Sequence, residues 1–280
     1  MKKVLNLLTG TLIIALLFSC KKEDAVPTAK NINPADANAL QSAIIIQGAT
    51  LVPGNLPAPS GSGAPVTSLY QNSASISPGG NLILPFRFTS GSGYSTCYVQ
   101  IQGATNGYWR IPNPNAGSSP NSGTIGIPIR LPSNLDLGSF CVVYCIVDNS
   151  GRVSNIMITC VSVEESLNCS NASKAGNEGL TFTTVTMGNT SGNAVLQYDT
   201  YSVPDRIDVY QGSTWLMGTG NNPNSIIPPI SNCSAPANGF VGRAGTFNIP
   251  YNPSAGKELT IVVSGCLGGG TAWDWQLSCP

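Results

Sequence analysis

The chain has 280 residues, with 13 Lys and Arg against 13 Asp and Glu, so its formal net charge is zero, and it contains no histidine. The lack of a basic excess argues against nucleic acid as a partner. The lack of histidine excludes His-based triads and imidazole general bases. Only 9% of residues are charged, and many short apolar runs stand between Gly- and Pro-rich turns, a composition that predicts an all-β protein.

Residues 1–19 have the layout of a secretory signal peptide. Two lysines open the chain, and the apolar run that follows, residues 4–18, is shorter than the ~20 residues of a membrane-spanning helix. The run ends in Leu-Phe-Ser-Cys, residues 17–20, which resembles the lipobox of Bacteroidota-type outer-membrane lipoproteins. The resemblance implies cleavage before Cys20 and acyl chains on Cys20 that anchor the protein in the membrane. The alternative is an ordinary signal peptide with a cysteine nearby.

The Lys-Lys-Glu-Asp sequence of residues 21–24 is similar to the short charged signal that sends such lipoproteins to the outer face of the outer membrane. We therefore expect a lipid-anchored, surface-exposed protein; the alternatives are the periplasmic face and a plain solvated linker. Residues 20–66 are rich in Ala, Asn, Pro, Gly and Ser and are predicted to be a flexible tether. A short helix near residues 34–43 and a short strand near residues 43–48 fit inside it.

Residues 67–163 are predicted to form an immunoglobulin-like β-sandwich, with a general resemblance to the Ig-like modules of Bacteroidota surface proteins. Apolar side chains alternate in residues 81–89, 96–104 and 124–132, as expected of half-buried strands. Two further strands flank the Asp-Asn-Ser-Gly turn of residues 148–151. A four-residue loop there places Val147 opposite Arg152 and Cys141 opposite Ile158.

The cysteines after Cys20 predict a disulfide framework, since an even number of them in an exported chain indicates disulfides. No Cys-x-x-Cys pair occurs, which argues against zinc. The eight form two sets of four, which suggests two disulfides in each of two domains. The expected pairs are Cys141–Cys160 and Cys97–Cys145, with other connectivities open, and then Cys169–Cys279 and Cys233–Cys266.

Residues 164–280 are predicted to form a second β-sandwich. The sequence Pro-Asp-Arg-Ile-Asp-Val-Tyr-Gln-Gly, residues 204–212, resembles a CUB-type domain, a disulfide-stapled jelly roll, although the usual cysteine spacing of that family is not reproduced. In calcium-binding CUB-type domains the acid before this strand is a ligand. The resemblance therefore implies calcium at Asp205, with Asp199 as a second ligand. Asp208, on the strand face of Arg206 and Tyr210, is expected to be a salt-bridged surface acid.

Tryptophans supply the candidate ligand-binding residues. Trp109 and Trp215 lie near predicted turns, where an exposed indole could stack on a sugar ring; the alternative is that each is part of the core. Trp273 and Trp275 share one strand face and are expected in the core.

These features predict a non-catalytic binding or adhesion protein of the cell surface that recognises a glycan or another protein. The alternatives are a structural subunit of an outer-membrane assembly and a glycan hydrolase that uses aspartates.

Overall fold

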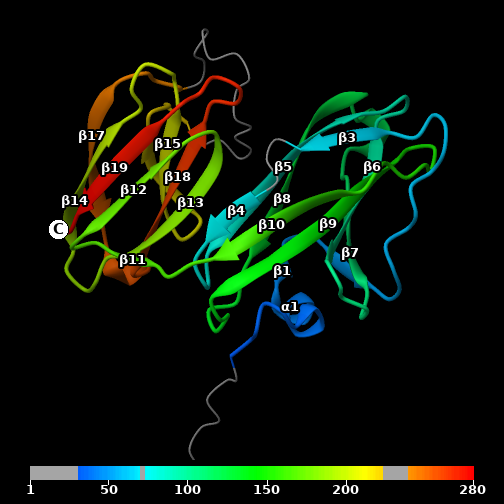
Figure 1. The fold of residues 1–280 in the computed structure, drawn as a ribbon, viewed down its shortest axis with the longest axis horizontal. Helices are drawn as coiled ribbons and strands as arrows, with labels where there is room; N and C mark the ends of the chain where they lie inside the picture. Colours follow the sequence, from blue (N-terminus) through cyan, green and yellow to red (C-terminus); the bar gives the residue numbers. More distant parts are fainter. Residues whose placement is uncertain (1–30, 70–72, 223–238) are drawn as a thin grey trace, which may run out of the picture. The chain divides into compact units, whose positions relative to one another are not determined.

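The structure is a computed structural model that describes residues 31–69, 73–222 and 239–280. The regular secondary structure of these ranges is almost entirely β-strand (Figure 1), which confirms the all-β class. Residues 31–280 form one compact unit. The predicted signal peptide, the predicted lipidation site Cys20 and the charged residues 21–24 lie outside the described residues. In the described ranges, no helix is long and apolar enough to cross a membrane.

The first half of the unit is built from a four-stranded and a six-stranded sheet, with strand orders β1-β8-β5-β3 and β2-β7-β6-β9-β10-β4. All neighbours are antiparallel except β10 and β4. Leu82, Leu84 and Phe86 are buried between the sheets, as their alternation predicts. The strands are β1 (Ile45–Ile46), β2 (Thr50–Val52), β3 (Val66–Leu69), β4 (Ser73–Ile76), β5 (Asn81–Thr89), β6 (Tyr94–Ile101), β7 (Tyr108–Pro112), β8 (Ser122–Arg130), β9 (Gly138–Asp148) and β10 (Met157–Val163).

The second half is built from a five-stranded and a four-stranded sheet, with orders β11-β13-β18-β15-β16 and β12-β19-β14-β17. Their shared core contains Trp273 and Trp275, each 1% exposed, as expected. The strands are β11 (Leu167–Asn168), β12 (Ala172–Gly176), β13 (Gly179–Thr186), β14 (Gly192–Asp199), β15 (Arg206–Gln211), β16 (Thr214–Gly218), β17 (Ala244–Tyr251), β18 (Glu258–Gly265) and β19 (Trp273–Ser278). The division of the chain into domains at residues 163 and 164 stays a prediction.

Part of the predicted tether is folded, and the short helix and short strand expected within it are present. Helix α1 (Ala37–Ala43) begins at Asp36, whose side chain accepts a hydrogen bond from the Ala39 amide, and strands β1 and β2 join the two sheets. Leu40 is fully buried in the core, and Gln41 accepts a hydrogen bond from the Ile101 amide. The apolar side chains among the Ala and Asn residues of this segment therefore anchor it to the first pair of sheets.

The β9–β10 hairpin differs from the expected register by two residues. Cys141 lies opposite Cys160, and Val143 lies opposite Ile158. Next to the turn, Val147 lies opposite Val153 rather than the expected Arg152, a shift of one residue. A second shift of one residue occurs before β10 begins at Met157. A shift of two residues leaves each side chain on the same face of the sheet, and Cys141 and Cys160 form the predicted disulfide.

A disulfide between Cys97 and Cys145 is wrong: both are free and buried. In the β6–β9 register Cys97 lies opposite Ile146, whereas Cys145 lies opposite Tyr98. Successive side chains of a strand point to opposite faces, so Cys97 points into the core between the sheets and Cys145 points to the outer side.

The remaining cysteines belong to the second half of the unit. Cys169 and Cys279 form the predicted disulfide, which ties residues that follow β11 and β19. Cys266 is disulfide-bonded as well. Its predicted partner, Cys233, lies outside the described residues.

Candidate functional site

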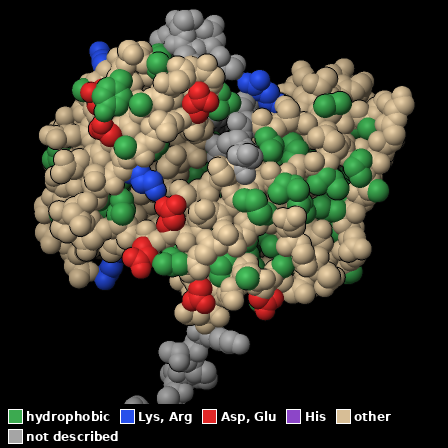
Figure 2. Space-filling model, viewed as in Figure 1, with side chains coloured by type: hydrophobic (Ala, Val, Ile, Leu, Met, Phe, Trp, Pro, Cys, Tyr) green, Lys and Arg blue, Asp and Glu red, His purple; other side chains and the backbone are tan. Residues whose placement is uncertain are grey.

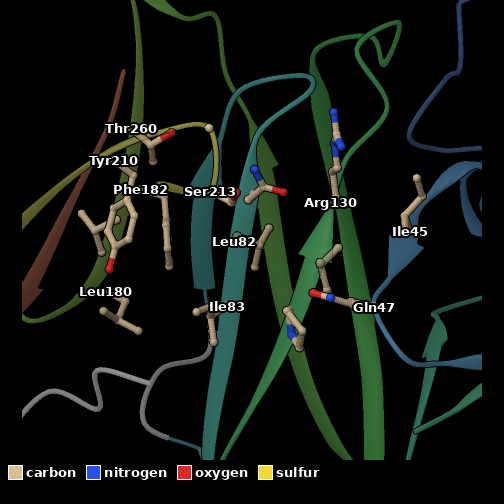
Figure 3. Close-up of a pocket in the computed structure, with 15 residues that line it drawn as sticks. Ile45, Gln47, Leu82, Ile83, Arg130, Leu180, Phe182, Tyr210, Ser213 and Thr260 are labelled. Atoms are coloured by element: carbon tan, nitrogen blue, oxygen red, sulfur yellow. The ribbon is translucent and has the colours of Figure 1, made fainter. Parts of the chain in front are cut away.

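A cavity of about 530 Å³ lies between two sheets of the compact unit. One wall comes from strands β1, β5 and β8, and the other from β13, β15 and β18 with the β15–β16 turn. Figure 3 shows Phe182 and Tyr210 on one side of the cavity and Arg130, Gln47 and Ile45 on the other. This is the size and composition of a pocket for an organic ligand, which typically measures about 300–1,000 Å³ and is mostly apolar.

The first wall follows from the alternation of side chains along β5. Leu82 and Leu84 face the core, so Asn81 and Ile83 face outward. Across the sheet, Ile83 lies opposite Pro128, and Asn81 lies opposite Arg130. Arg130 in turn lies opposite Ile45 of β1. The outer face therefore presents an apolar surface that ends in a row of three side chains, Ile45, Arg130 and Asn81.

The second wall also follows from the alternation of side chains, here along β13, β15 and β18. The odd-numbered residues of β18, such as Ile261, face the core between its two sheets, so Thr260 and Val262 face outward. Phe182 lies opposite Val262, and Tyr210 lies opposite Thr260. Two aromatic side chains and their aliphatic neighbours thus form a continuous apolar surface.

The β15–β16 turn forms one edge of the cavity. Gln211 lies opposite Thr214, which leaves Gly212 and Ser213 as a two-residue turn. Gly212 has a φ of 59°, in the left-handed region that such hairpin turns require and that glycine adopts without strain. The Gln211 amide donates hydrogen bonds to the carbonyls of Asn252 (2.6 Å) and Gly256 (2.8 Å), which fix the end of β15.

The charge of the cavity is positive. Among the described residues, Arg130 is the only charged side chain that lines the cavity. Burial, with a smaller contribution from the nearby Asp208 carboxylate, raises the pKa of Tyr210 to about 12. The phenol is therefore neutral near pH 7 and can donate a hydrogen bond.

Trp109 does not offer the expected exposed ring. It is 6% exposed and lies in the core of the first half, opposite Val99 of β6. The aromatic side chain sits in the middle of β7 (Tyr108–Pro112), on the strand face that points between the sheets. The alternative prediction, that Trp109 is part of the core, is confirmed.

Trp215 is half-buried and belongs to a polar cluster on β15 and β16 that does not line the cavity. Its indole donates a hydrogen bond of 2.9 Å to Asp208 Oδ1. Asp208 also accepts from Arg206 Nε at 2.7 Å and from Arg206 Nη2 at 2.8 Å. The predicted salt bridge is present, but the expectation of a surface acid is wrong: Arg206 is 2% exposed and Asp208 is fully buried.

The two predicted calcium ligands lie in different surroundings. Asp205 is fully buried; its Oδ1 accepts from the Cys266 amide at 2.9 Å and its Oδ2 from the Thr271 hydroxyl at 2.7 Å. Burial raises its pKa to about 6 against the lowering effect of these hydrogen bonds. Asp199, at the end of β14, accepts from the Tyr201 amide and lies opposite Asp274. No group of three or more Cys, Asp or Glu in the described ranges is arranged to hold a metal, and calcium at Asp199 and Asp205 stays a prediction.

Most of the cavity residues lie on strands, whereas the binding residues predicted from the sequence lie near turns. The sequence does hold one signal for these residues, a strand in which apolar and polar side chains do not alternate. Residues 258–265, Glu-Leu-Thr-Ile-Val-Val-Ser-Gly, carry three consecutive branched apolar residues, which indicates that both faces of the strand are covered. Figure 2 shows that charged side chains are sparse, and that apolar side chains also gather over β9 and β10, where Ile158 is 43% exposed.

Comparison with known proteins gives no family. No family model and no curated protein matches the chain. Among solved structures, an SrpA adhesin variant from Streptococcus sanguinis matches at 16% identity and a TM-score of 0.26, over 38% of this chain and 60% of that chain. The D00-D0 domain of intimin matches at 11% identity and a TM-score of 0.23, over 76% of this chain and 92% of that chain. A SusE-like protein matches at 11% identity and a TM-score of 0.22, over 75% of this chain and 96% of that chain. These scores are too low to indicate a shared function.

Proposed function

We propose that the protein is a lipid-anchored, non-catalytic binding protein of the bacterial cell surface whose ligand, part of a glycan or of another surface molecule, occupies the cavity beside Phe182 and Tyr210. The observation that carries this proposal is the cavity itself. It combines about 530 Å³ of space, two aromatic side chains and a few polar groups at its edge. These are the properties by which proteins hold organic ligands.

The chemistry of the described residues supports binding over catalysis. No carboxylate of the described residues lines the cavity, so these residues offer no acid–base pair of the kind that glycan hydrolysis uses. Burial raises the pKa of the Cys145 thiol to about 12, and burial also raises that of Cys97. Neither thiol supplies a thiolate nucleophile near pH 7.

Anchoring at the outer membrane is supported by the sequence of residues 1–24. The apolar leader, the lipobox cysteine and the charged residues after it agree with an exported lipoprotein that faces outward. A surface position brings the cavity into contact with external ligands.

The proposal is tested by closing the cavity without touching either core. Ser213 is exposed at the edge, and Ser213→Trp places a bulky ring there. Ser170→Trp is the matched control, since Ser170 lies in an exposed turn and does not line the cavity. We expect the full-length protein to bind members of a glycan and surface-protein array, Ser170→Trp to bind the same members, and Ser213→Trp to lose them. Equal binding by the three proteins would show that the cavity is not the binding site.

A further inference from the structure

Arg130 is the feature of the cavity that sets the ligand's charge. Its side chain is exposed, at the end of β8, and it forms no ion pair with any described residue. In register it stands between Ile45 of β1 and Asn81 of β5, so all three side chains share the outer face of that sheet. Gln47, just after β1, also lines the cavity. One guanidinium and two amides therefore offer hydrogen-bond donors at one side of the cavity.

The opposite side offers little that could neutralise Arg130. Phe182 and Val262 are 6% and 5% exposed, and they are directly paired across β13 and β18. Tyr210 is neutral, since its pKa is raised, and Thr260 beside it is uncharged. Figure 3 shows Arg130 across the cavity from Phe182 and Tyr210. The cavity thus has a cationic end and an apolar, aromatic wall.

We infer, on the basis of the proposed function, that the cavity takes an amphipathic anion. The ligand's apolar or planar part lies against Phe182 and Tyr210, and its carboxylate, sulfate or phosphate group binds the Arg130 guanidinium. Arginine matches such groups through two parallel hydrogen bonds, and charge-assisted bonds are about twice as strong as neutral ones. Both parts of the site are needed for this preference. The apolar wall by itself does not distinguish charged from neutral ligands, and an exposed arginine by itself does not require an apolar part in the ligand.

The test uses two probes that differ only in charge. Anilinonaphthalene sulfonate (ANS) and N-phenylnaphthylamine (NPN) share one aromatic skeleton, but only ANS carries a sulfonate. Both fluoresce on entering an apolar site. The protein is the whole mature chain with Cys20→Ser, exported behind a leader that is not lipidated, so that it keeps all described residues and its oxidising compartment without detergent.

We expect one ANS site per chain and an ANS affinity roughly 10-fold or more above that of NPN, because only the sulfonate of ANS forms charge-assisted hydrogen bonds with Arg130; a factor of ten corresponds to about 1.4 kcal/mol. Arg130→Gln should remove this difference and leave NPN binding unchanged. Arg243→Gln is the control, since Arg243 is exposed and does not line the cavity. Inorganic phosphate, which has charge without an apolar part, should displace ANS only at far higher concentration than naphthoate does.

The outcomes separate this inference from the function on which it rests. If ANS and NPN bind equally and both are lost in Ser213→Trp, the cavity binds ligands and the anionic preference is refuted. If Arg130→Gln and Arg243→Gln lower ANS binding equally, the effect comes from net charge, and the assignment to Arg130 is refuted. If Ser213→Trp changes neither probe, the cavity is not the binding site and the proposed function fails as well.

Discussion

Single residues decide how this protein responds to pH, and Asp205 is the clearest case. Its folded pKa, about 6, lies above the ordinary value of 3.8 because the carboxyl group is buried. Between these values the folded state binds the proton more tightly than the unfolded state does. The stability from this group is therefore fully present below about pH 4 and is lost as the pH rises through 6, by roughly 3 kcal/mol for about two pKa units.

Asp205→Asn is expected to remove this loss. Relative to the parent, the variant's free energy of unfolding should rise as the pH increases from 4 to 7, measured by urea denaturation at each pH. Asp148→Asn is the control. Burial alone would raise the pKa of Asp148, but hydrogen bonds from Arg152 and Ser150 lower it below 3.8. Its contribution to stability is therefore lost only as the pH falls below about 4, so this variant should change little relative to the parent between pH 4 and 7. If Asp205 binds calcium instead, Asp205→Asn will abolish a calcium-dependent rise in Tm.

The cysteines show how far residue-level prediction reaches. The pair Cys141–Cys160 could be predicted because the hairpin puts both residues on one face, whichever of two registers it adopts. The pair Cys97–Cys145 could not be excluded from the sequence, because only the β6–β9 register shows that the two thiols lie on opposite faces of the sheet.

Thiol labelling checks this assignment. In the denatured, unreduced chain, peptide mapping should find label on Cys97 and Cys145. In the native protein both should resist labelling, because they are buried and their pKa values are raised. A disulfide-linked peptide that contains Cys97 and Cys145 would contradict the structure.

At the scale of elements, alternation predicted the inner face of most strands but not the outer one. Leu82, Leu84 and Phe86 face the core as expected. The outer faces of β5 and β13 are apolar because they line a shared cavity, and Ile83 and Phe182 come from strands about a hundred positions apart. No local pattern indicates which strand lies opposite such a face, so the cavity could not be placed from the sequence.

The buried pair on β15 makes a prediction at this scale. Asp208→Asn leaves Arg206 buried, with its charge uncompensated by Asp208, which should cost about 3–5 kcal/mol of unfolding free energy. Lys174–Glu164 is a matched pair with both side chains partly exposed, and Glu164→Gln should cost at most about 1 kcal/mol. Urea denaturation of the two variants compares them directly, and equal losses would show that burial does not set the importance of the Arg206–Asp208 pair.

At the scale of the whole molecule, the sequence predicts the location of the protein better than its ligand. The predicted leader and the lipobox-like residues 17–20 are a local, linear pattern in the sequence, whereas the cavity depends on the arrangement of separate sheets. In the proposed function, acyl chains on Cys20 supply the membrane affinity, so Cys20→Ser should move the protein from the membrane fraction to the soluble fraction of the envelope. Immunoblots of the separated fractions measure this, and a variant that stays membrane-bound would exclude lipid anchoring through Cys20.

The central claim, that the cavity between β5 and β13 is the binding site, is tested most directly by hydrogen–deuterium exchange. The mature Cys20→Ser chain is compared with and without saturating ANS, and again with NPN. We predict slower exchange in peptides that cover residues 45–50 and 210–214, at the edge of the cavity, and the same protection must be absent in Ser213→Trp. Protection elsewhere on the chain, or protection that persists in Ser213→Trp, would contradict the claim.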